Sequence, residues 1–420
     1  MTLRSRGSHS KYRYIVPIIG TTIGVIMLAN IPRLQELMER DGFDAVIATC
    51  PENVTYLSGF WAMSQWVRRG PQAYVLFPKR GEQPCIIANS GILDLVADQD
   101  IWVTEIRRYG YFQMDVDASA TLDATDAMQK RLFESEADKG PVEALVAAMK
   151  EKGLTRGKIG LDELGITPQC LDQLNSLLPG ATFVRSFALF ENVRSVKTPG
   201  EIAILRSAAR ATEHAIEAAL TFANAGVTER EMLREFNACL ARHDAAPVVG
   251  CIGFGTRSAM INVQPSDRAL RKGDLIRFDV GARHKHYRSD MSRGAALGEP
   301  AKKIAEYYSA VEKGVLAAYD ILKPGLKVST LFDHVVETVR REGIPHFKRS
   351  HVGHGIGVDG YDPPNIAGNS NGVFEENMVV CIETPYYELG FAGLQVEDMV
   401  HVTKDGAQSL MTLDTALRII

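Results

Sequence analysis

The chain has 420 residues, of which 45% are hydrophobic and 23% charged, and its formal net charge is −4 at neutral pH. This is the composition of an ordinary globular protein with enough length for two or three domains and a large core. The small negative charge excludes the basic footprint of a nucleic-acid-binding protein. The six cysteines are scattered and form no Cys-x-x-Cys pair, so we expect reduced thiols and no disulfide framework.

The first 29 residues allow two interpretations. Basic residues precede an apolar stretch, Ile15–Ala29, as they do in an export signal or a membrane anchor. The stretch is short for a membrane span and contains Pro17. The alternative is a start assigned too early, with the natural start at Met27, because the following residues already form a complete first helix and strand. We expect the second case and a cytoplasmic protein; the first would make it exported or membrane-anchored.

Residues 30–190 show alternating helical and strand patterns. Leu34, Leu37 and Met38 lie at helical spacing, and Gly42 is a typical helix end. The predicted elements are a helix at 31–41, strands at 44–49, 73–78 and 85–89, a helix at 140–154, a further strand, and a helix after Pro168. The alternation predicts a small α/β domain.

Two helix starts mark the beginning of a second domain. Thr198 is a good N-cap, Pro199 suits the first helical position, and Glu201 completes a capping box, so a long helix is predicted to about residue 225. Thr228 and Glu231 form the same pattern before a second helix. From about residue 247 strands dominate, interrupted by helices at about 301–322 and 329–342. We therefore predict an α+β domain over residues 195–420.

Four short segments of this second domain carry four carboxylates and one imidazole. The residues are Asp279, Asp290, His354, Glu383 and Glu397. Each residue alone is more often a turn residue, a solvated side chain or part of a glycine-rich loop. The two aspartates are close enough in sequence for a strand, a turn and a returning strand to bring them side by side. We expect the glycines around His354 to leave room for a metal to approach the backbone.

Together, these five residues predict a metal centre. An unpaired buried carboxylate is costly, and no equivalent run of Lys or Arg accompanies the four carboxylates. Hard oxygen ligands with one imidazole favour Mn²⁺, with Co²⁺, Fe²⁺ or Zn²⁺ as alternatives. Two divalent ions would share bridging carboxylates and a bridging hydroxide, which would attack a polarised carbonyl.

The segments FDVGARHKHYRSD, HVGHGIG, CIETP and LQVED resemble the metallopeptidase family of methionine aminopeptidase, aminopeptidase P and prolidase, which shares the pita-bread fold with creatinase. PENVTYLSGF resembles part of the N-terminal domain of prolidase-like members, and NVRSVKTPGEIAILRSA resembles the join to their catalytic domain. The resemblance covers nearly the whole chain. It implies an α+β pita-bread catalytic domain after a smaller creatinase-like α/β domain, and a homodimer or higher oligomer.

The resemblance also implies a function and a role for each of the five residues. Asp279 would chelate one ion, and Asp290 and Glu397 would bridge both. His354 and Glu383 would hold the second ion, with Glu383 near the nucleophilic water as a general base. The implied activity is that of a dinuclear metallohydrolase that cleaves the amide bond of an Xaa-Pro dipeptide or short peptide.

The chain departs from these peptidases around the predicted metal site. Polar residues replace histidines, a glutamate and an arginine that the family usually carries; the replacements are Asn262, Ser350, Tyr361, Asp362 and Gln395. Asn262 could donate to an oxyanion, and Tyr361 could donate or transfer a proton. His351 could replace a missing histidine by a one-residue shift, or could be an ordinary loop residue.

These departures leave other functions open. A non-peptidase member of the family could act on a small amide, an amidino compound or a compound like dimethylsulfoniopropionate, and the polar replacements favour that alternative. A catalytically silent binding module is disfavoured because all five predicted ligands are present. Metal content would separate the binding module from the enzymes, and a substrate panel would separate the two enzymes.

Two further groups of residues allow either a functional or a purely structural interpretation, and one cysteine allows only the structural one. Aromatic and basic residues after the N-terminal motif could line the mouth of a neighbouring site or pack in the core; they are Tyr56, Trp61, Trp66, Arg68 and Arg69. The run 283–286 could attract an anion, but it reads better as the tip of the hairpin between the two aspartates. We expect Cys381 to pack in the core.

Overall fold

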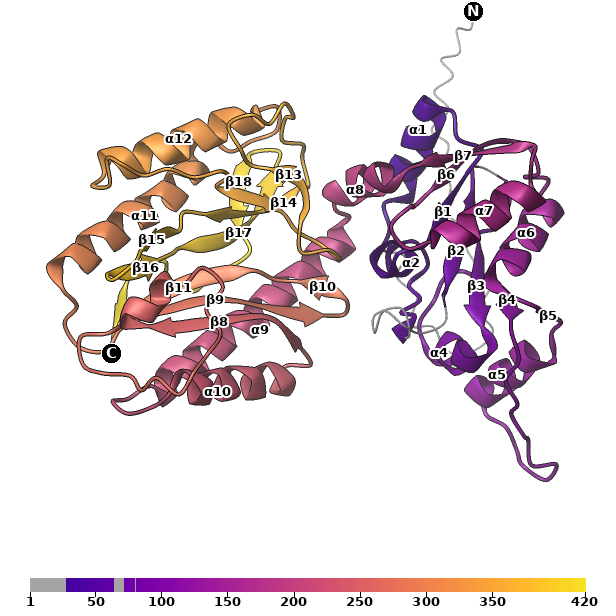
Figure 1. Cartoon of the computed structure of the whole chain (residues 1–420), viewed down its shortest axis with the longest axis horizontal. Helices are drawn as coiled ribbons and strands as arrows, with labels where there is room; N and C mark the ends of the chain where they lie inside the picture. The colour runs from indigo at the N-terminus through magenta and orange to yellow at the C-terminus, as the bar shows by residue number, and fades with distance from the viewer. Residues whose placement is uncertain (1–27, 64–71, 80) are drawn as a thin grey trace, which may run out of the picture.

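The computed structural model describes residues 28–63, 72–79 and 81–420. The apolar N-terminal stretch up to Met27, and Trp66, Arg68 and Arg69, lie outside this part of the chain. The described residues form two domains that lie side by side (Figure 1). Within them, no helix is both long and apolar enough to span a bilayer.

The N-terminal domain is built on a seven-stranded sheet in the order β5-β4-β3-β2-β1-β6-β7. Its strands are β1 Ala45–Ala48, β2 Tyr74–Pro78, β3 Cys85–Asn89, β4 Glu105–Tyr109, β5 Ala137–Asp138, β6 Gly157–Leu161 and β7 Ala181–Arg185. Strand β2 runs antiparallel to both neighbours, and the other pairs are parallel. The strands predicted at 44–49, 73–78 and 85–89 are confirmed, whereas β4, β5 and β7 were not predicted.

Helices cover both faces of this sheet because its strands alternate their buried side chains. The helices are α1 Ile31–Asp41, α2 Pro51–Ser58, α4 Leu93–Asp98, α5 Ala124–Glu134, α6 Pro141–Glu151 and α7 Pro168–Leu177. Val46 and Val75 pack in one core with residues of α1, α2 and α4, whereas Ala45 and Leu76 pack in the other with residues of α6. Helix α1 ends at Gly42, whose φ of 71° is left-handed, as predicted.

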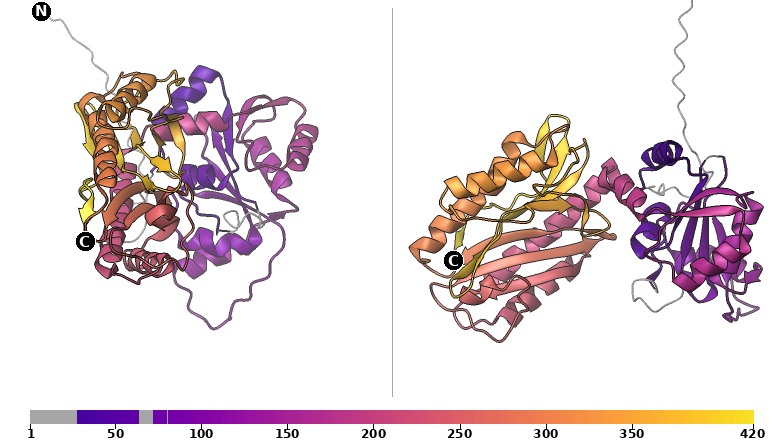
Figure 2. Two further views of the ribbon diagram at one scale, coloured as in Figure 1. Left: turned by 60° about the vertical axis from the view of Figure 1, so that its left-hand side comes forward. Right: turned by 45° about the horizontal axis from the view of Figure 1, so that its top comes forward.

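A short helix, α8 Phe187–Ser195, leads from the first domain into the second (Figure 1 and the right view of Figure 2). Helices α9 Pro199–Phe222 and α10 Glu229–Arg242 follow. Both predicted capping boxes are present: Thr198 with Glu201 begins α9, and Thr228 with Glu231 begins α10.

The C-terminal domain has a ten-stranded sheet with the central order β10-β9-β11-β17-β14-β12-β13. Its strands and the separate β15-β16 hairpin are β8 Ala246–Phe254, β9 Leu275–His284, β10 Tyr287–Arg288, β11 Met291–Ala296, β12 Gly353–Gly355, β13 Asp362–Asn365, β14 Val379–Glu383, β15 Tyr386–Glu388, β16 Ala392–Leu394, β17 Glu397–Thr403, β18 Gly406–Ser409 and β19 Arg418–Ile419. The two predicted interrupting helices are α11 Lys302–Ile321 and α12 Val328–Arg341.

Two helix pairs pack on this sheet and leave its inner surface to the site. Residues of α9 and α10 share a core with β8 and β9, and residues of α11 and α12 share another with β14 and β17. Figure 1 shows the two pairs on opposite sides of the strands. The hairpin between the two aspartates turns at Lys285 and His286, whose φ angles are 45° and 73°. The run 283–286 therefore forms the hairpin tip, as predicted.

Candidate metal centre

Four strands bring the predicted residues into one row across the C-terminal sheet. Asp279 on β9 lies opposite Ser292 on β11, Ser292 lies opposite Glu397 on β17, and Glu397 lies opposite Glu383 on β14. Residues that are directly opposite each other in adjacent strands project from the same face. The register therefore places three carboxylates on one surface, although they are far apart in sequence.

The remaining predicted residues join the row by period-2 alternation. Asp290 precedes Ser292 by two positions, and His354 on β12 lies opposite Cys381, which precedes Glu383 by two. Ligating atoms of Asp279, Asp290 and Glu397 all lie within 4.8 Å of one another, and so do those of His354, Cys381 and Glu397. The two groups share Glu397.

The cluster concentrates negative charge away from water. Glu383, Glu397 and His354 are buried, and the two aspartates keep limited contact with solvent. Burial, followed by repulsion between the carboxylates, raises the pKa of Asp290 and Glu397 well above the usual range. Burial raises the pKa of Asp279 to about 6, although the Arg277 guanidinium opposes this shift.

His354 presents one ring nitrogen to this cluster. Its Nδ1 lies 3.0 Å from the carbonyl oxygen of Gly355, and its Nε2 lies 4.0 Å from Glu397 Oε1. A hydrogen bond from Nδ1–H to the carbonyl would leave Nε2 free to bind a cation. Burial lowers the pKa of His354, which favours the neutral imidazole that metal binding requires.

Glu383 differs from the other carboxylates because two basic side chains approach it. His351 Nδ1 lies 3.2 Å from Glu383 Oε1, and Arg349 Nη2 lies 4.0 Å from Oε2. Burial alone would raise the pKa of Glu383, but the imidazole and the guanidinium lower it overall. The loop histidine therefore does reach the cluster.

A buried arginine beside the cluster was missed. Arg277 Nη1 lies 3.7 Å from Asp279 Oδ2 and donates to Gln395 Oε1 at 3.0 Å and to the Tyr387 hydroxyl at 2.8 Å. Its Nη2 donates to the carbonyl oxygens of Met260 and Ile261. The cluster therefore has one buried cation beside it, although no run of Lys or Arg accompanies the carboxylates in the sequence. An Arg two residues before an Asp in a strand, on the same face, was the signal that could have revealed it.

Gln395, one of the departures, connects this arginine to the cluster. It is buried, and its Nε2 lies 3.5 Å from Glu397 Oε2 while its Oε1 accepts from Arg277. Cys381 is buried in a hydrophobic core, as assigned, but its thiol also borders His354 and Glu397. Burial raises the pKa of this thiol well above its usual range, so it stays protonated.

Two other predicted residues lie at the edge of the site. The Tyr361 ring centroid is 4.1 Å from that of His354, with 68% of the tyrosine exposed. Asn262 is exposed in the turn after Ile261, and among the described residues no hydrogen bond joins its amide to a carboxylate of the cluster. The structure thus brings the Tyr361 ring to His354, whereas Asn262 makes no hydrogen bond to the cluster among the described residues.

The glycines around His354 have a different use from the one expected. A Cβ on Gly353 would lie 1.9 Å from the carbonyl oxygen of Cys381, and a Cβ on Gly355 would lie 2.3 Å from that of Pro363. These clashes come from the neighbouring strands, because β12 passes closely between β14 and β13. The space left by the glycines admits protein backbone, which corrects the expectation that it admits a metal.

The donor set is suited to divalent cations. Asp290 Oδ1 is buried and has no hydrogen-bond partner among the described residues, and four carboxylates meet one adjacent arginine and one peripheral one. Oxygen donors with one imidazole match Mn²⁺, Fe²⁺, Co²⁺ or Zn²⁺. Such ions would supply the missing partner and balance the charge.

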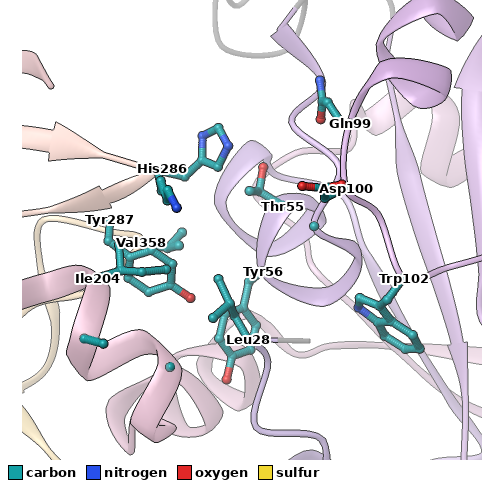
Figure 3. A pocket seen from close by; sticks show the side chains of 14 residues that line it. Leu28, Thr55, Tyr56, Gln99, Asp100, Trp102, Ile204, His286, Tyr287 and Val358 are labelled. Carbon is teal, nitrogen blue, oxygen red and sulfur yellow. The ribbon is translucent and has the colours of Figure 1, made fainter. Parts of the chain in front are cut away.

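A cavity of about 540 Å³ lies elsewhere, between the two domains, and none of the five predicted ligands lines it. Figure 3 shows His286 and Tyr287 of the hairpin on one side and Thr55 and Tyr56 of α2 on the other. Tyr56 is buried and accepts a hydrogen bond from the Asn30 backbone. Trp61 stacks on His286 with a centroid distance of 5.5 Å. Tyr56 and Trp61 thus both make contacts within the protein.

Family comparisons agree with this two-domain organisation. Residues 203–404 match the model of metallopeptidase family M24, and residues 30–196 match that of the creatinase/prolidase N-terminal domain. An Xaa-Pro dipeptidase of Lactobacillus delbrueckii subsp. lactis is 25% identical over 395 residues, which is 93% of this chain and 99% of that protein.

Solved structures share the fold. The Xaa-Pro dipeptidase from Bacillus anthracis superposes with a TM-score of 0.76 at 24% identity, over 93% of this chain and 99% of that one. The X-Pro aminopeptidase from Thermotoga maritima MSB8 has a TM-score of 0.74 at 22% identity, over 91% of this chain and 99% of its own. The expected fold, a creatinase-like α/β domain followed by an α+β pita-bread domain, is confirmed.

Proposed function

Because the chain belongs to metallopeptidase family M24 and carries a creatinase/prolidase N-terminal domain, we propose that it is a divalent-metal-dependent hydrolase of Xaa-Pro dipeptides or short Xaa-Pro peptides. The observation that carries the proposal is the convergence of four carboxylates and His354 on one face of the sheet. Their negative charge exceeds that of the cations described beside them.

Five residues would hold two metal ions, for which Mn²⁺ is the proposed identity. Asp279 would bind one ion, Asp290 and Glu397 both, and His354 and Glu383 the second. Glu397 supports a bridging role because it belongs to both groups of converging atoms. Bound divalent ions lower the pKa of water and polarise a carbonyl oxygen.

The protein's own side chains would accept and donate the protons that move during hydrolysis. Glu383 Oε1, with His351 Nδ1 at 3.2 Å, forms a pair that can accept a proton and pass it on. The Tyr361 hydroxyl is a neutral donor, because burial and the nearby carboxylates raise its pKa. Asn262, whose amide makes no hydrogen bond to the cluster among the described residues, would assist as an oxyanion donor.

Three further expectations belong to this proposal. Residues 30–190 and 195–420 would form the two functional units, and residues 1–29 a signal, an anchor or a misassigned start. We propose a cytoplasmic homodimer, which sedimentation of the purified protein would test. Membrane attachment would require a genuine anchor in residues 15–29.

A second candidate is hydrolysis of a small non-peptide amide or amidino compound. Among the described residues no hydrogen bond joins the Asn262 amide to the cluster, and Gln395 accepts a hydrogen bond from Arg277. Asn262 and Gln395 both stand where the resemblance implies a histidine and an arginine in the related peptidases. A small substrate would need fewer contacts outside the metal centre than a peptide does.

The decisive experiment is proline release from a panel of Xaa-Pro dipeptides and Xaa-Pro-Xaa tripeptides by Mn²⁺-loaded protein. We expect release that depends on the metal and falls at least about 1000-fold in Asp279→Asn, because a ligand that also faces Arg277 is lost. Asp274→Asn is the matched control, since this aspartate pairs with Arg268 outside the cluster. It should leave turnover within about twofold.

Two results would count against the proposal. A metal-replete protein that releases no proline from any peptide would exclude the Xaa-Pro activity and direct the search to small amides. Activity that survives Asp279→Asn would exclude this cluster as the catalytic centre.

A further inference from the structure

We propose that the N-terminal domain acts in catalysis through a buried polar chain, Asn53–Arg194–Asp362, which positions Tyr361 at the metal centre. The inference rests on the proposed function for its kinetic consequence. It also explains two motifs that the metal centre leaves unused: Asn53 lies in PENVTYLSGF and Arg194 in NVRSVKTPGE.

The chain begins inside the N-terminal domain. Asp162 Oδ2 accepts hydrogen bonds from the Asn53 side-chain amide at 2.8 Å and from the backbone N–H of Cys50 at 2.9 Å. This fixes the amide orientation, so that Asn53 Oδ1 faces Arg194 and accepts a hydrogen bond from its Nη1. Asn53 and Asp162 are both fully buried.

The hydrogen bonds of Arg194 then connect this part of the chain of residues to the catalytic domain. It lies on α8, and its Nε and Nη2 both donate to Asp362 Oδ1, at 3.0 and 2.8 Å. Lys197 Nζ lies 3.8 Å from the other carboxylate oxygen of Asp362. Arg194, Lys197 and Asp362 are all buried, so the charges have no water to replace a lost partner.

Asp362 fixes the position of Tyr361 because the two residues are adjacent. Asp362 begins β13, where it pairs with Gly355, the residue after His354. The Tyr361 side chain itself is 68% exposed and approaches the His354 ring at 4.1 Å. A ring that is mostly exposed depends on its backbone for its location. The buried Asp362 supplies that anchor.

The packing around Asp362 leaves little freedom for an alternative arrangement. A Cβ on Gly357 would lie 2.8 Å from Asp362 Oδ2 and 3.4 Å from the Lys197 side chain. The loop from His354 to Asp362 thus closes tightly around the carboxylate. A change at Asn53 would reach the metal centre through Arg194 and this loop, although Asn53 belongs to the other domain.

A double-mutant cycle distinguishes positioning of Tyr361 from a purely structural role of Asn53. A purely structural role would lower kcat equally with and without the Tyr361 hydroxyl. We expect Asn53→Ala to lower kcat about 10- to 100-fold for an Xaa-Pro dipeptide, because a proton donor that shifts by about 1 Å loses its alignment. In the Tyr361→Phe background the same change should lower kcat by less than about twofold. KM and the Mn²⁺ dissociation constant should stay within about threefold in both backgrounds.

The matched control is Arg33→Gln. Arg33 on α1 makes a different interdomain contact, a bidentate pair with Glu375 at 2.8 Å for both bonds. Its loss should change kcat by less than about twofold and show no coupling to Tyr361. If Asn53→Ala fails to fold, Asn53→Ser replaces it, since the shorter side chain keeps a polar group but cannot span Asp162 and Arg194.

Hydrogen exchange supplies a readout that needs no substrate. Asn53→Ala should speed backbone exchange in residues 357–365 about tenfold or more, and Arg33→Gln should not. If the wild type hydrolyses no peptide, the proposed function fails and exchange alone decides the positioning. Equal kcat losses in both Tyr361 backgrounds, an unaffected kcat in Tyr361→Phe, or unchanged exchange in Asn53→Ala would each overturn the inference.

Discussion

At the scale of single residues, the candidate metal centre depends on a buried positive charge that compensates a neighbouring carboxylate where water does not reach. Arg277 is fully buried, and its guanidinium makes hydrogen bonds to two side chains and two backbone carbonyls while facing Asp279. Removal of one partner of a buried pair leaves the other charge uncompensated, which costs more than the pair contributes as a whole. This arginine is therefore both a structural anchor and part of the electrostatics of the metal centre.

Replacement of Arg277 by Gln should destabilise the metal-free protein. We expect its free energy of unfolding to fall by about 3–5 kcal/mol, because the change leaves two backbone carbonyls without a hydrogen-bond donor and removes the cation beside Asp279. Arg268→Gln, which breaks a partly exposed pair with Asp274, should cost about 1 kcal/mol or less. Urea unfolding of chelator-treated protein measures both. Equal losses in the two variants would show that Arg277 has no special electrostatic role.

At the scale of elements, two capping boxes of identical pattern lie in opposite environments. Glu201 lies in the first turn of α9 in the protein interior, where it accepts hydrogen bonds from the Tyr287 hydroxyl and the Thr198 backbone. Burial raises the pKa of Glu201 to about 7, although the Thr198 hydrogen bond opposes this shift. Glu231 lies in the first turn of α10 near the surface, where hydrogen bonds from Thr228 lower its pKa. The local motif is the same, and packing decides the sign of the pKa shift.

These opposite shifts predict opposite effects of pH on stability. The pKa of Glu201 is higher in the folded chain than in the unfolded one, so its contribution is fully present below about pH 4.5 and is lost as pH rises through 7. The wild type should therefore lose about 3 kcal/mol relative to Glu201→Gln between pH 4 and 8. Denaturant unfolding at several pH values provides the measurement.

Glu231→Gln is the control for this prediction. Because the pKa of Glu231 is lowered in the folded chain, its contribution is present above the unfolded pKa and is lost as pH falls. The stability difference between wild type and Glu231→Gln should therefore change in the opposite direction, and by less. The assignment of an uncharged Glu201 below pH 7 would be contradicted if the unfolding free energies of the wild type and Glu201→Gln differed by the same amount at every pH.

At the scale of the whole molecule, the candidate metal centre joins parts of the chain that have separate cores. Asp279 comes from the half of the sheet that packs on α9 and α10, and Glu383 and Glu397 come from strands that also pack on α11 and α12. The buried chain through Arg194 adds the N-terminal domain to the same region. Cation binding at this position should therefore stabilise the catalytic domain as a unit.

Metal loading should raise the free energy of unfolding by about 2.7 kcal/mol per site at a free metal concentration 100 times Kd. Thermal unfolding with and without Mn²⁺, after chelator treatment, measures the shift. Asp290→Asn should lose most of it, whereas Glu375→Gln, which alters a carboxylate of the interdomain contact, should keep it. The prediction fails if Mn²⁺ stabilises Asp290→Asn as much as it stabilises the wild type.

The amino-acid sequence by itself determined those features that local rules govern. Period-2 alternation placed Glu383 and Glu397 in strands, the Thr198 and Thr228 boxes located two helix starts, and the motifs indicated the fold. The roles of Arg277, Arg194 and Asn53 were decided only by the tertiary structure. Arg194 and Asp362, for example, are 168 residues apart in the chain. Whether a polar side chain lies in solvent or in a buried pair depends on such distant neighbours, because the cost of burying a charge is set by what surrounds it.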